Sequence, residues 1–195
     1  MPNPAHFNRP KLSDHRALHD QACHNMEEGA VTPSYQANRE AIIAQLNAAL
    51  ATEYVCSLRY YQHYYAAKGM FAAVVKGEFL EHAEEEKEHA HMIAERIVQL
   101  GGVPDFNPDT FCKRSHAEFQ CSSCIHAMMK EDLISERIAI DTYREMIAFV
   151  GHKDSTTRRL LEKILAQEEE HADEFADLLE GWQSNNSCHC AQQKT

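Results

Sequence analysis

The chain has 195 residues, of which 44% are hydrophobic and 25% are charged, as expected for one globular domain with a substantial core. Its formal net charge of −11 argues against free nucleic acid as a partner, because binding the phosphate backbone requires a cationic surface. No apolar run approaches the ~20 residues of a membrane span, and residues 1–10 lack the apolar stretch of a signal peptide. We therefore expect a cytoplasmic protein with no membrane partner and with reduced cysteines.

Residues 1–34 are polar and contain four prolines, which indicates an N-terminal arm. This arm carries more acidic than basic side chains, so it does not have the charge of a DNA-binding arm. Residues 35–181 contain long stretches rich in good helix formers, and the pattern predicts helices over 35–67, 70–100, 122–150 and 154–180. Glycines stand at the expected ends of these helices, and Ser122 or Ser123 is a possible N-cap of the third. Residues 182–195 form a polar C-terminal tail.

The lengths of the connections predict how these helices are joined. The first two helices are separated by a tight turn, as are the last two, so each pair is expected to form an antiparallel hairpin. The connection over 101–121 can extend by more than ~60 Å at ~3.3 Å per residue, whereas a 30-residue helix is only ~45 Å long. The predicted fold is therefore an all-α four-helix bundle of two hairpins joined by a long crossover.

Two short motifs of the form E-x-x-H occur in corresponding helices. They are Glu86-x-x-His89 in the second helix and Glu168-x-x-His171 in the fourth. A spacing of three residues places a carboxylate and an imidazole on one face of a helix, where they can bind the same metal ion. A single motif of this kind means little in a Glu-rich helix, but two of them in matching helices predict a dinuclear site.

The other two helices each supply one glutamate at the same height. Glu53 and Glu86 lie at nearly equal distances from the turn at Gly69, and Glu136 and Glu168 are similarly placed around Gly151. Tyr60 and Tyr143 each follow their own helix's glutamate by seven residues, or two turns, which predicts that each tyrosine shares a face with that glutamate.

The residues around these two glutamates are apolar, so we expect both faces to point inward. Leu46, Leu50 and Leu58 lie along the helix of Glu53, and Leu133, Ile134, Ile138 and Ile140 flank Glu136. An unpaired carboxylate in such surroundings costs several kcal/mol, and coordination of a metal ion removes that cost.

Over roughly residues 36–180 the chain resembles the ferritin-like diiron proteins, especially the bacterioferritin and Dps-like ferritin branch. The resemblance rests on Glu53 with Tyr60, on Glu136 and on the two E-x-x-H motifs. It implies two non-haem iron ions per subunit, a ferroxidase reaction that oxidises Fe(II) with O2 or H2O2, and iron storage or detoxification. The implied ligands are Glu53, Glu86, His89, Glu136, Glu168 and His171, with Tyr60 as a further catalytic residue.

Two departures from the family pattern refine this expectation. Bacterioferritins bind haem through a methionine just after the second-helix glutamate, where this chain has Lys87, so we expect no haem. Ferritins with 24 subunits usually carry a fifth short helix, which the short polar tail is not expected to form. A hollow, Dps-like homo-oligomer of 12 subunits is therefore favoured over a 24-subunit shell.

Several features leave alternatives open. Cys121 and Cys124 open the third helix and Cys188 and Cys190 follow the fourth; they are interpreted as free thiols, with a zinc site or a redox disulfide as the alternative. Cys56 is either a small core residue or a neighbour of the metals. His82, one turn before Glu86, either supports the ligands or is a transient stop for iron.

The alternative function is a diiron redox enzyme that stores no iron, such as a rubrerythrin-like peroxidase or an oxygenase. Rubrerythrins usually add a module with two C-x-x-C pairs, and this chain has only one such pair. The same ligand set also accepts manganese or zinc, so the residues alone do not define the native metal.

Overall fold

The computed structural model describes residues 14–120, 122 and 124–191, with side chains described as far as Trp182. The chain divides into two compact units, Met1–Tyr35 and Gln36–Thr195. The first unit contains helix α1 (His15–Ala22) and the 3-10 turn η1 (Met26–Glu28), so part of the expected polar arm is helical. In the second unit, every regular element among the described residues is a helix.

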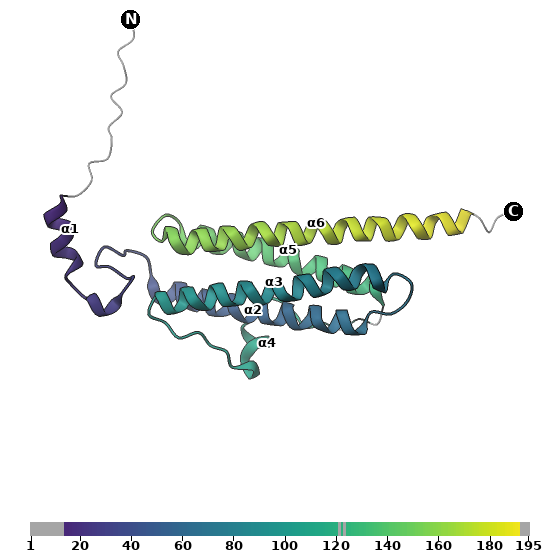
Figure 1. The fold of residues 1–195 in the computed structure, drawn as a ribbon, viewed down its shortest axis with the longest axis horizontal. Helices are drawn as coiled ribbons and strands as arrows, with labels where there is room; N and C mark the ends of the chain where they lie inside the picture. The colour runs from purple at the N-terminus through teal and green to yellow at the C-terminus, as the bar shows by residue number, and fades with distance from the viewer. Residues whose placement is uncertain (1–13, 121, 123, 192–195) are drawn as a thin grey trace, which may run out of the picture. The chain divides into compact units, whose positions relative to one another are not determined.

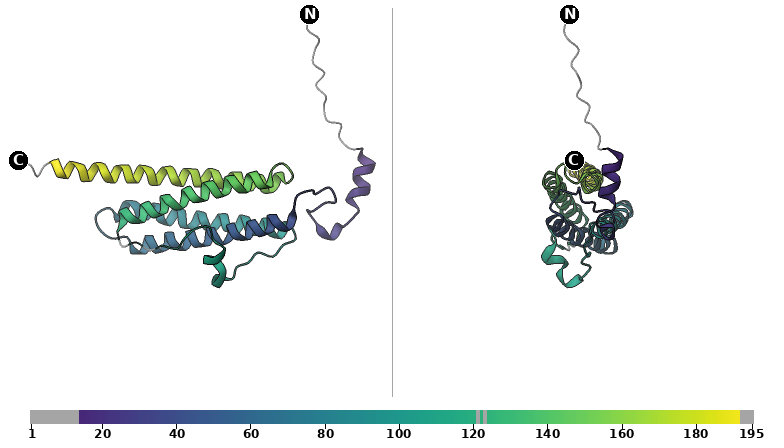
Figure 2. Two further views of the ribbon diagram at one scale, coloured as in Figure 1. Left: turned by 180° about the vertical axis from the view of Figure 1, so that it is seen from behind. Right: turned by 90° about the vertical axis from the view of Figure 1, so that its left-hand side faces the viewer.

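Four long helices form a bundle in the second unit (Figure 1). They are α2 (Arg39–Ala66), α3 (Ala72–Gln99), α5 (Ile125–Val150) and α6 (Ser155–Ala191). Helix α2 packs mainly along α3, and α5 along α6, while α2 also contacts α5 and α3 contacts α6. Each helix therefore has two main neighbours, and the right-hand view of Figure 2 looks along the four helices from one end of the bundle.

The long connection between α3 and α5 runs from one end of the bundle to the other, as the sequence predicts (Figure 1). It contains the 3-10 turn η2 (Pro108–Thr110) and the short helix α4 (Phe111–Arg114), which packs on α2. The guanidinium of Arg114 holds the connection by donating to the carbonyl oxygens of Asn47 at 2.7 Å and Asp105 at 2.9 Å. The all-α fold with two hairpins and a crossover is thus confirmed.

Glycine is needed at the C-terminal ends of two helices, where a side chain would strain the backbone or meet a neighbouring helix. Gly151 ends α5 with a φ of 59°, a left-handed conformation that side chains disfavour, and its N–H donates to the carbonyl of Ile147 at 3.0 Å. At the end of α3, a Cβ on Gly102 would lie only 2.9 Å from the side chain of Ile43. This glycine therefore permits a close approach between the α3 terminus and α2.

Two expected helix ends were wrong. Helix α5 begins at Ile125, with Cys124 at the N-cap position, because the hydroxyl of Ser122 instead donates to Glu131; Ser123 lies outside the described residues. Helix α6 continues through Gly181 to Ala191 instead of ending there. A single interior glycine costs only about 1 kcal/mol, which is insufficient to end a long helix unless the glycine adopts a left-handed conformation.

Helix α2 is long and apolar enough to cross a membrane by length and composition alone. Core helices of soluble bundles pass the same test, and 56% of the apolar window in α2 is buried inside the bundle. Its buried face includes Leu46, Leu50 and Tyr60, none of which is measurably exposed.

Three of the apolar residues expected to point inward instead lie on the surface of the chain. Leu58 is 52% exposed, Ile134 is 59% exposed and Ile138 is 43% exposed. The glutamates beside them are nevertheless buried, so the inward faces are narrower than the apolar sequence pattern indicated. Apolar residues that lie outside the buried face of a helix form a second apolar surface, which is exposed in a single chain.

Candidate metal centre

The two E-x-x-H motifs face each other across α3 and α6. Glu86, His89 and Glu168 are each 1% exposed, and His171 is 2% exposed. The i, i+3 spacing places each glutamate beside its histidine on the inward face of its helix. The neighbouring helices α2 and α5 complete the arrangement with Glu53 and Glu136, each 1% exposed.

The six side chains form two overlapping groups, each with ligand atoms within 4.8 Å of one another. One group contains Glu53, Glu86, His89 and Glu168; the other contains Glu86, Glu136, Glu168 and His171. Glu86 and Glu168 belong to both groups, which is the arrangement expected when two carboxylates lie between two cations. All six residues predicted from the sequence are therefore brought together at one height in the bundle.

Each of the two tyrosines donates to the glutamate of the other helix pair. The hydroxyl of Tyr60 on α2 donates to Glu136 on α5, and the hydroxyl of Tyr143 on α5 donates to Glu53 on α2. Burial raises the pKa of both phenols well above the usual value, so both remain protonated donors. The sequence predicted that Tyr60 shares a face with Glu53; both side chains are buried, but the hydroxyl of Tyr60 bonds Glu136 across the bundle.

Burial and mutual repulsion strongly perturb the carboxylates. Burial and the negative charge of Glu86 raise the pKa of Glu53 to about 8 and also raise the pKa of Glu136 and of Glu168. Burial also opposes ionisation of Glu86, but the nearby imidazoles of His171 and His89 outweigh it and hold its pKa well below the usual value. Glu86 is therefore the group most readily ionised.

The histidines carry the complementary charge. Burial disfavours their charged forms, but the nearby carboxylates of Glu168 and Glu53 raise the pKa of His89, and the contact with Glu86 raises the pKa of His171 to about 9. Protons therefore balance the buried carboxylates in the protein alone. Cations entering the centre would displace those protons, because metals bind deprotonated ligands.

Several buried polar atoms at the centre find no hydrogen-bond partner in the part of the chain that the structure describes. They are Glu86 Oε1, both carboxylate oxygens of Glu168, and His171 Nδ1. His89 Nδ1 lies 3.1 Å from Glu168 Oε1, but its hydrogen bond goes to Glu53 Oε2 at 3.3 Å. Unpartnered buried carboxylate oxygens are costly, and divalent cations are the natural partners for this donor set. The residues thus fit a pair of metal ions.

Sequence reasoning missed a reciprocal pair of contacts around the histidines. Gln167, directly before Glu168, accepts from His89 Nε2 at 3.2 Å, and Glu85, directly before Glu86, contacts His171 Nε2 at 2.7 Å. Each motif therefore supplies an oxygen that orients the histidine of the other motif. The signal was present in the sequence as an acceptor side chain immediately before each E-x-x-H.

A second buried network adjoins the centre and was also missed. Asp132 accepts from Arg59 Nε at 2.9 Å and from His63 Nδ1 at 2.8 Å, and all three side chains are 0% exposed. Arg59 immediately precedes Tyr60, so this pairing fixes the turn of α2 that presents Tyr60 to Glu136. The buried charges are compensated by one another, as burial requires.

The structure also describes some of the cysteines, and the histidine, whose roles the sequence left open. Cys56 packs with Val55 in a small apolar cluster and belongs to neither metal group, so it is a core residue. Cys124 is an exposed free thiol, whereas the side chains of Cys121, Cys188 and Cys190 lie outside the described residues. Lys87 pairs with Glu84 of its own helix. His82 is buried and stacks on His171 at 4.0 Å between ring centroids.

Comparison with known proteins is consistent with this geometry. Residues 43–184 match the model of the ferritin-like domain. A nutrient stress-induced DNA-binding protein of Synechococcus is 32% identical over 141 residues, which cover 69% of this chain and 78% of that protein.

Two solved structures extend the comparison. A dodecameric thioferritin, the bacterioferritin-related protein of Bacteroides fragilis, is 34% identical with a TM-score of 0.75, covering 78% of this chain and 92% of that chain. A ferritin-like diiron-carboxylate protein of Bacillus anthracis is 26% identical with a TM-score of 0.65, covering 74% of this chain and 99% of that chain.

Proposed function

The chain belongs to the ferritin-like domain family, and from that premise we propose that it is a ferroxidase that stores and detoxifies iron. Its substrates are Fe(II) and either O2 or H2O2, and the reaction takes place at the dinuclear centre inside each bundle. The observation that carries this proposal is the sharing of Glu86 and Glu168 by two groups of ligands, together with the buried oxygens of these two glutamates that have no hydrogen-bond partner among the described residues.

The donor set suits the oxidation of iron. Carboxylate oxygens are hard ligands that bind Fe(III) more strongly than Fe(II), so four of them favour the oxidised product. The imidazoles of His89 and His171 are softer donors and help to hold Fe(II) before it reacts. Tyr60 and Tyr143 keep Glu136 and Glu53 in place by hydrogen bonding, and the buried site limits access of water. We assign two iron ions per subunit to this centre.

We further propose that the chain assembles as a homo-oligomer, with 12 subunits as the favoured number. The thioferritin of Bacteroides fragilis is described as dodecameric, and Leu58, Ile134 and Ile138 provide exposed apolar surface on α2 and α5 for subunit contacts. Native mass spectrometry would distinguish a shell of 12 from a shell of 24 or from a dimer.

Nucleic acid is not part of this proposal, although the Synechococcus relative is named as a DNA-binding protein. The formal net charge of −11 opposes binding to phosphate backbones. A gel-shift assay at low salt tests this directly, and retention of duplex DNA would contradict it. The proposed location is the cytoplasm, where reduced thiols are expected.

The decisive test of function is aerobic addition of Fe(II) to the metal-free protein, followed by ferric absorbance and by iron analysis of the desalted protein. Storage predicts uptake far beyond two irons per chain, whereas a stop at two irons would favour a non-storing diiron redox enzyme. Glu136→Ala should abolish rapid oxidation, and Glu145→Ala, an exposed position on the same helix, should leave it unchanged. Equal rates in both variants would refute the assignment of the centre.

A further inference from the structure

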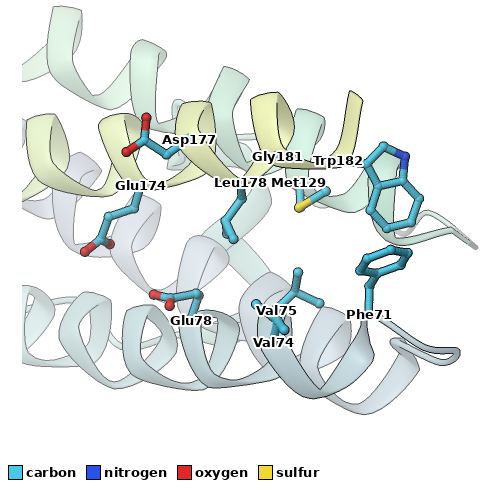
Figure 3. Close-up of a pocket in the computed structure, with 10 residues that line it drawn as sticks. All are labelled: Phe71, Val74, Val75, Glu78, Met129, Glu174, Asp177, Leu178, Gly181 and Trp182. Carbon is cyan, nitrogen blue, oxygen red and sulfur yellow. The ribbon is translucent and has the colours of Figure 1, made fainter. Parts of the chain in front are cut away.

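A groove of about 480 Å³ lies between α3 and α6 (Figure 3). Phe71 and Trp182 lie at one end of it, and Leu178 faces Val75 in the middle. At the other end the carboxylates of Glu78 and Glu174 project toward the space between the two helices. An apolar groove with two converging carboxylates at one end is suited to a cation at that end.

A buried histidine lies directly beneath these carboxylates. His82 follows Glu78 by one turn on α3, is 1% exposed, and has its Nε2 2.7 Å from Glu174 Oε2. Its second nitrogen, Nδ1, is buried and has no hydrogen-bond partner among the described residues. Glu78, His82 and Glu174 each offer a ligand atom within 4.8 Å of the others.

This cluster is continuous with the dinuclear centre. His82 stacks on His171 at 4.0 Å, and His82, Glu85 and His171 form a further group of possible ligands within 4.8 Å. His171 in turn belongs to the centre. The ligand groups therefore overlap from one to the next, and they pass from partly exposed Glu78 and Glu174 to the fully buried glutamates.

We propose that Glu78, His82 and Glu174 form a third cation site, outside the dinuclear centre, which takes up a divalent first-row metal ion and passes it to the centre beside His171. The site itself needs no assumption about oxidation, but its role as a supplier rests on the proposed function. Two carboxylates and one imidazole leave the remaining coordination positions to water, which favours exchange over permanent retention. Glu81 and Glu170 add negative charge around Glu174 and so attract cations.

Binding of Co(II) tests the site. Co(II) is not oxidised under argon, and its visible absorption bands depend on the ligands that bind it. Metal-free full-length protein is titrated with Co(II) under argon, and bound metal is counted by equilibrium dialysis. The wild-type chain should bind three Co(II) ions, two tightly and one more weakly. The double variant Glu78→Gln/Glu174→Gln should bind two, with the tight absorption bands unchanged.

The matched control is Glu88→Gln/Asp177→Asn, which removes the same charge from the same two helices. Glu88 and Asp177 are exposed, and the carboxylate of Asp177 points away from Glu78 in Figure 3. This control should retain the third ion. Loss of the third ion in the control would show that general surface charge, rather than the cluster, binds it, and would overturn the proposal.

Two further outcomes are equally decisive. A wild-type chain that binds only two Co(II) ions, or a Glu78→Gln/Glu174→Gln variant that retains three, would also overturn the third site. Failure of the wild-type chain to bind the two tight ions would instead contradict the proposed function. Crystals soaked in Co(II) should show an anomalous peak between Glu78, His82 and Glu174, and a third peak elsewhere would refute this assignment.

The role as a supplier has its own readout. At limiting Fe(II), oxidation by Glu78→Gln/Glu174→Gln should be several-fold slower than by the wild type, whereas at saturating Fe(II) the two rates should converge. This pattern separates delivery from chemistry, because a damaged centre would lower the rate at every Fe(II) concentration. Equal rates at limiting Fe(II) would exclude a delivery role.

Discussion

Tyr143 of α5 donates its hydroxyl hydrogen to Glu53 of α2, so the tyrosine of one hairpin positions a carboxylate of the other. Tyr60 and Glu136 repeat this relationship in the opposite direction. Two crossed hydrogen bonds therefore link α2 and α5 through the proposed centre. These bonds tie the geometry of the ligands to the packing of the two hairpins.

The crossed bonds predict the effect of removing either hydroxyl. Tyr143→Phe should slow Fe(II) oxidation by roughly 10- to 100-fold, because a hydrogen bond to a buried charged group is worth ~1.5–3 kcal/mol. Stopped-flow absorbance measures the rate. Tyr61→Phe is the control, since Tyr61 pairs with the exposed Glu84 outside the centre, and a comparable loss there would argue against a specific role for Tyr143.

The reciprocal acceptors before each motif predict an effect on metal affinity. Gln167→Leu removes the oxygen that orients His89, so Zn(II) affinity should fall by roughly 10- to 100-fold, the usual effect of losing such a contact. Competition with a chromophoric chelator measures the affinity. The control Glu88→Gln, at an exposed position on α3, should leave the Zn(II) affinity unchanged. An unchanged Zn(II) affinity in Gln167→Leu would show that the contact between Gln167 and His89 does not support metal binding.

The raised pKa values predict that the metal-free protein loses stability between pH 6.5 and 9. The folded chain retains protons on Glu53, whose pKa is about 8, and on His171, whose pKa is about 9, whereas the unfolded chain has released them over much of this range. Stability therefore falls as pH rises, by up to about 1.4 kcal/mol per pH unit for each such proton.

His82 does not counteract this trend. Burial and the neighbouring His171 lower its pKa to about 3, so the stability change linked to His82 occurs below pH 6.5 and has the opposite sign. Urea unfolding at several pH values measures the slope. Glu53→Gln should flatten it, and saturation with Zn(II) should reverse it, because metal binding becomes stronger as protons leave. A flat profile in the metal-free wild type would contradict these assignments.

The end of the bundle opposite the α2–α3 turn depends on one buried ion pair. Asp154 accepts two hydrogen bonds from Arg96 of α3, at 2.9 and 3.0 Å, and also accepts from the backbone N–H of Thr157 in the first turn of α6. Asp154→Ala should lower the free energy of unfolding by about 3–5 kcal/mol, since it removes the carboxylate that compensates the buried charge of Arg96 and also removes a helix cap.

Chemical denaturation of the metal-free protein measures that loss. The matched control is Glu162→Ala, which breaks the exposed pair between Arg158 and Glu162 on the same helix and should cost less than about 1 kcal/mol. Similar losses in the two variants would show that the Arg96–Asp154 pair has no special importance.

The sequence alone was sufficient to predict the four long helices of the bundle and the six residues that meet in the proposed centre. Helical periodicity is local, so the i, i+3 spacing in each motif placed glutamate and histidine on one face without knowledge of the fold. The turns at Gly69 and Gly151 also fixed the height of Glu53 and Glu136 relative to the two motifs, because rise per residue is constant.

Only the tertiary structure decided which side chains meet across helices. Contacts such as Tyr143 with Glu53, Gln167 with His89, and His82 with Glu174 depend on how each helix is rotated about its axis against its neighbours. That rotation is set by packing of the whole core, which no single helix encodes. For the same reason the apolar pattern around Ile134 and Ile138 wrongly indicated that those residues face the core.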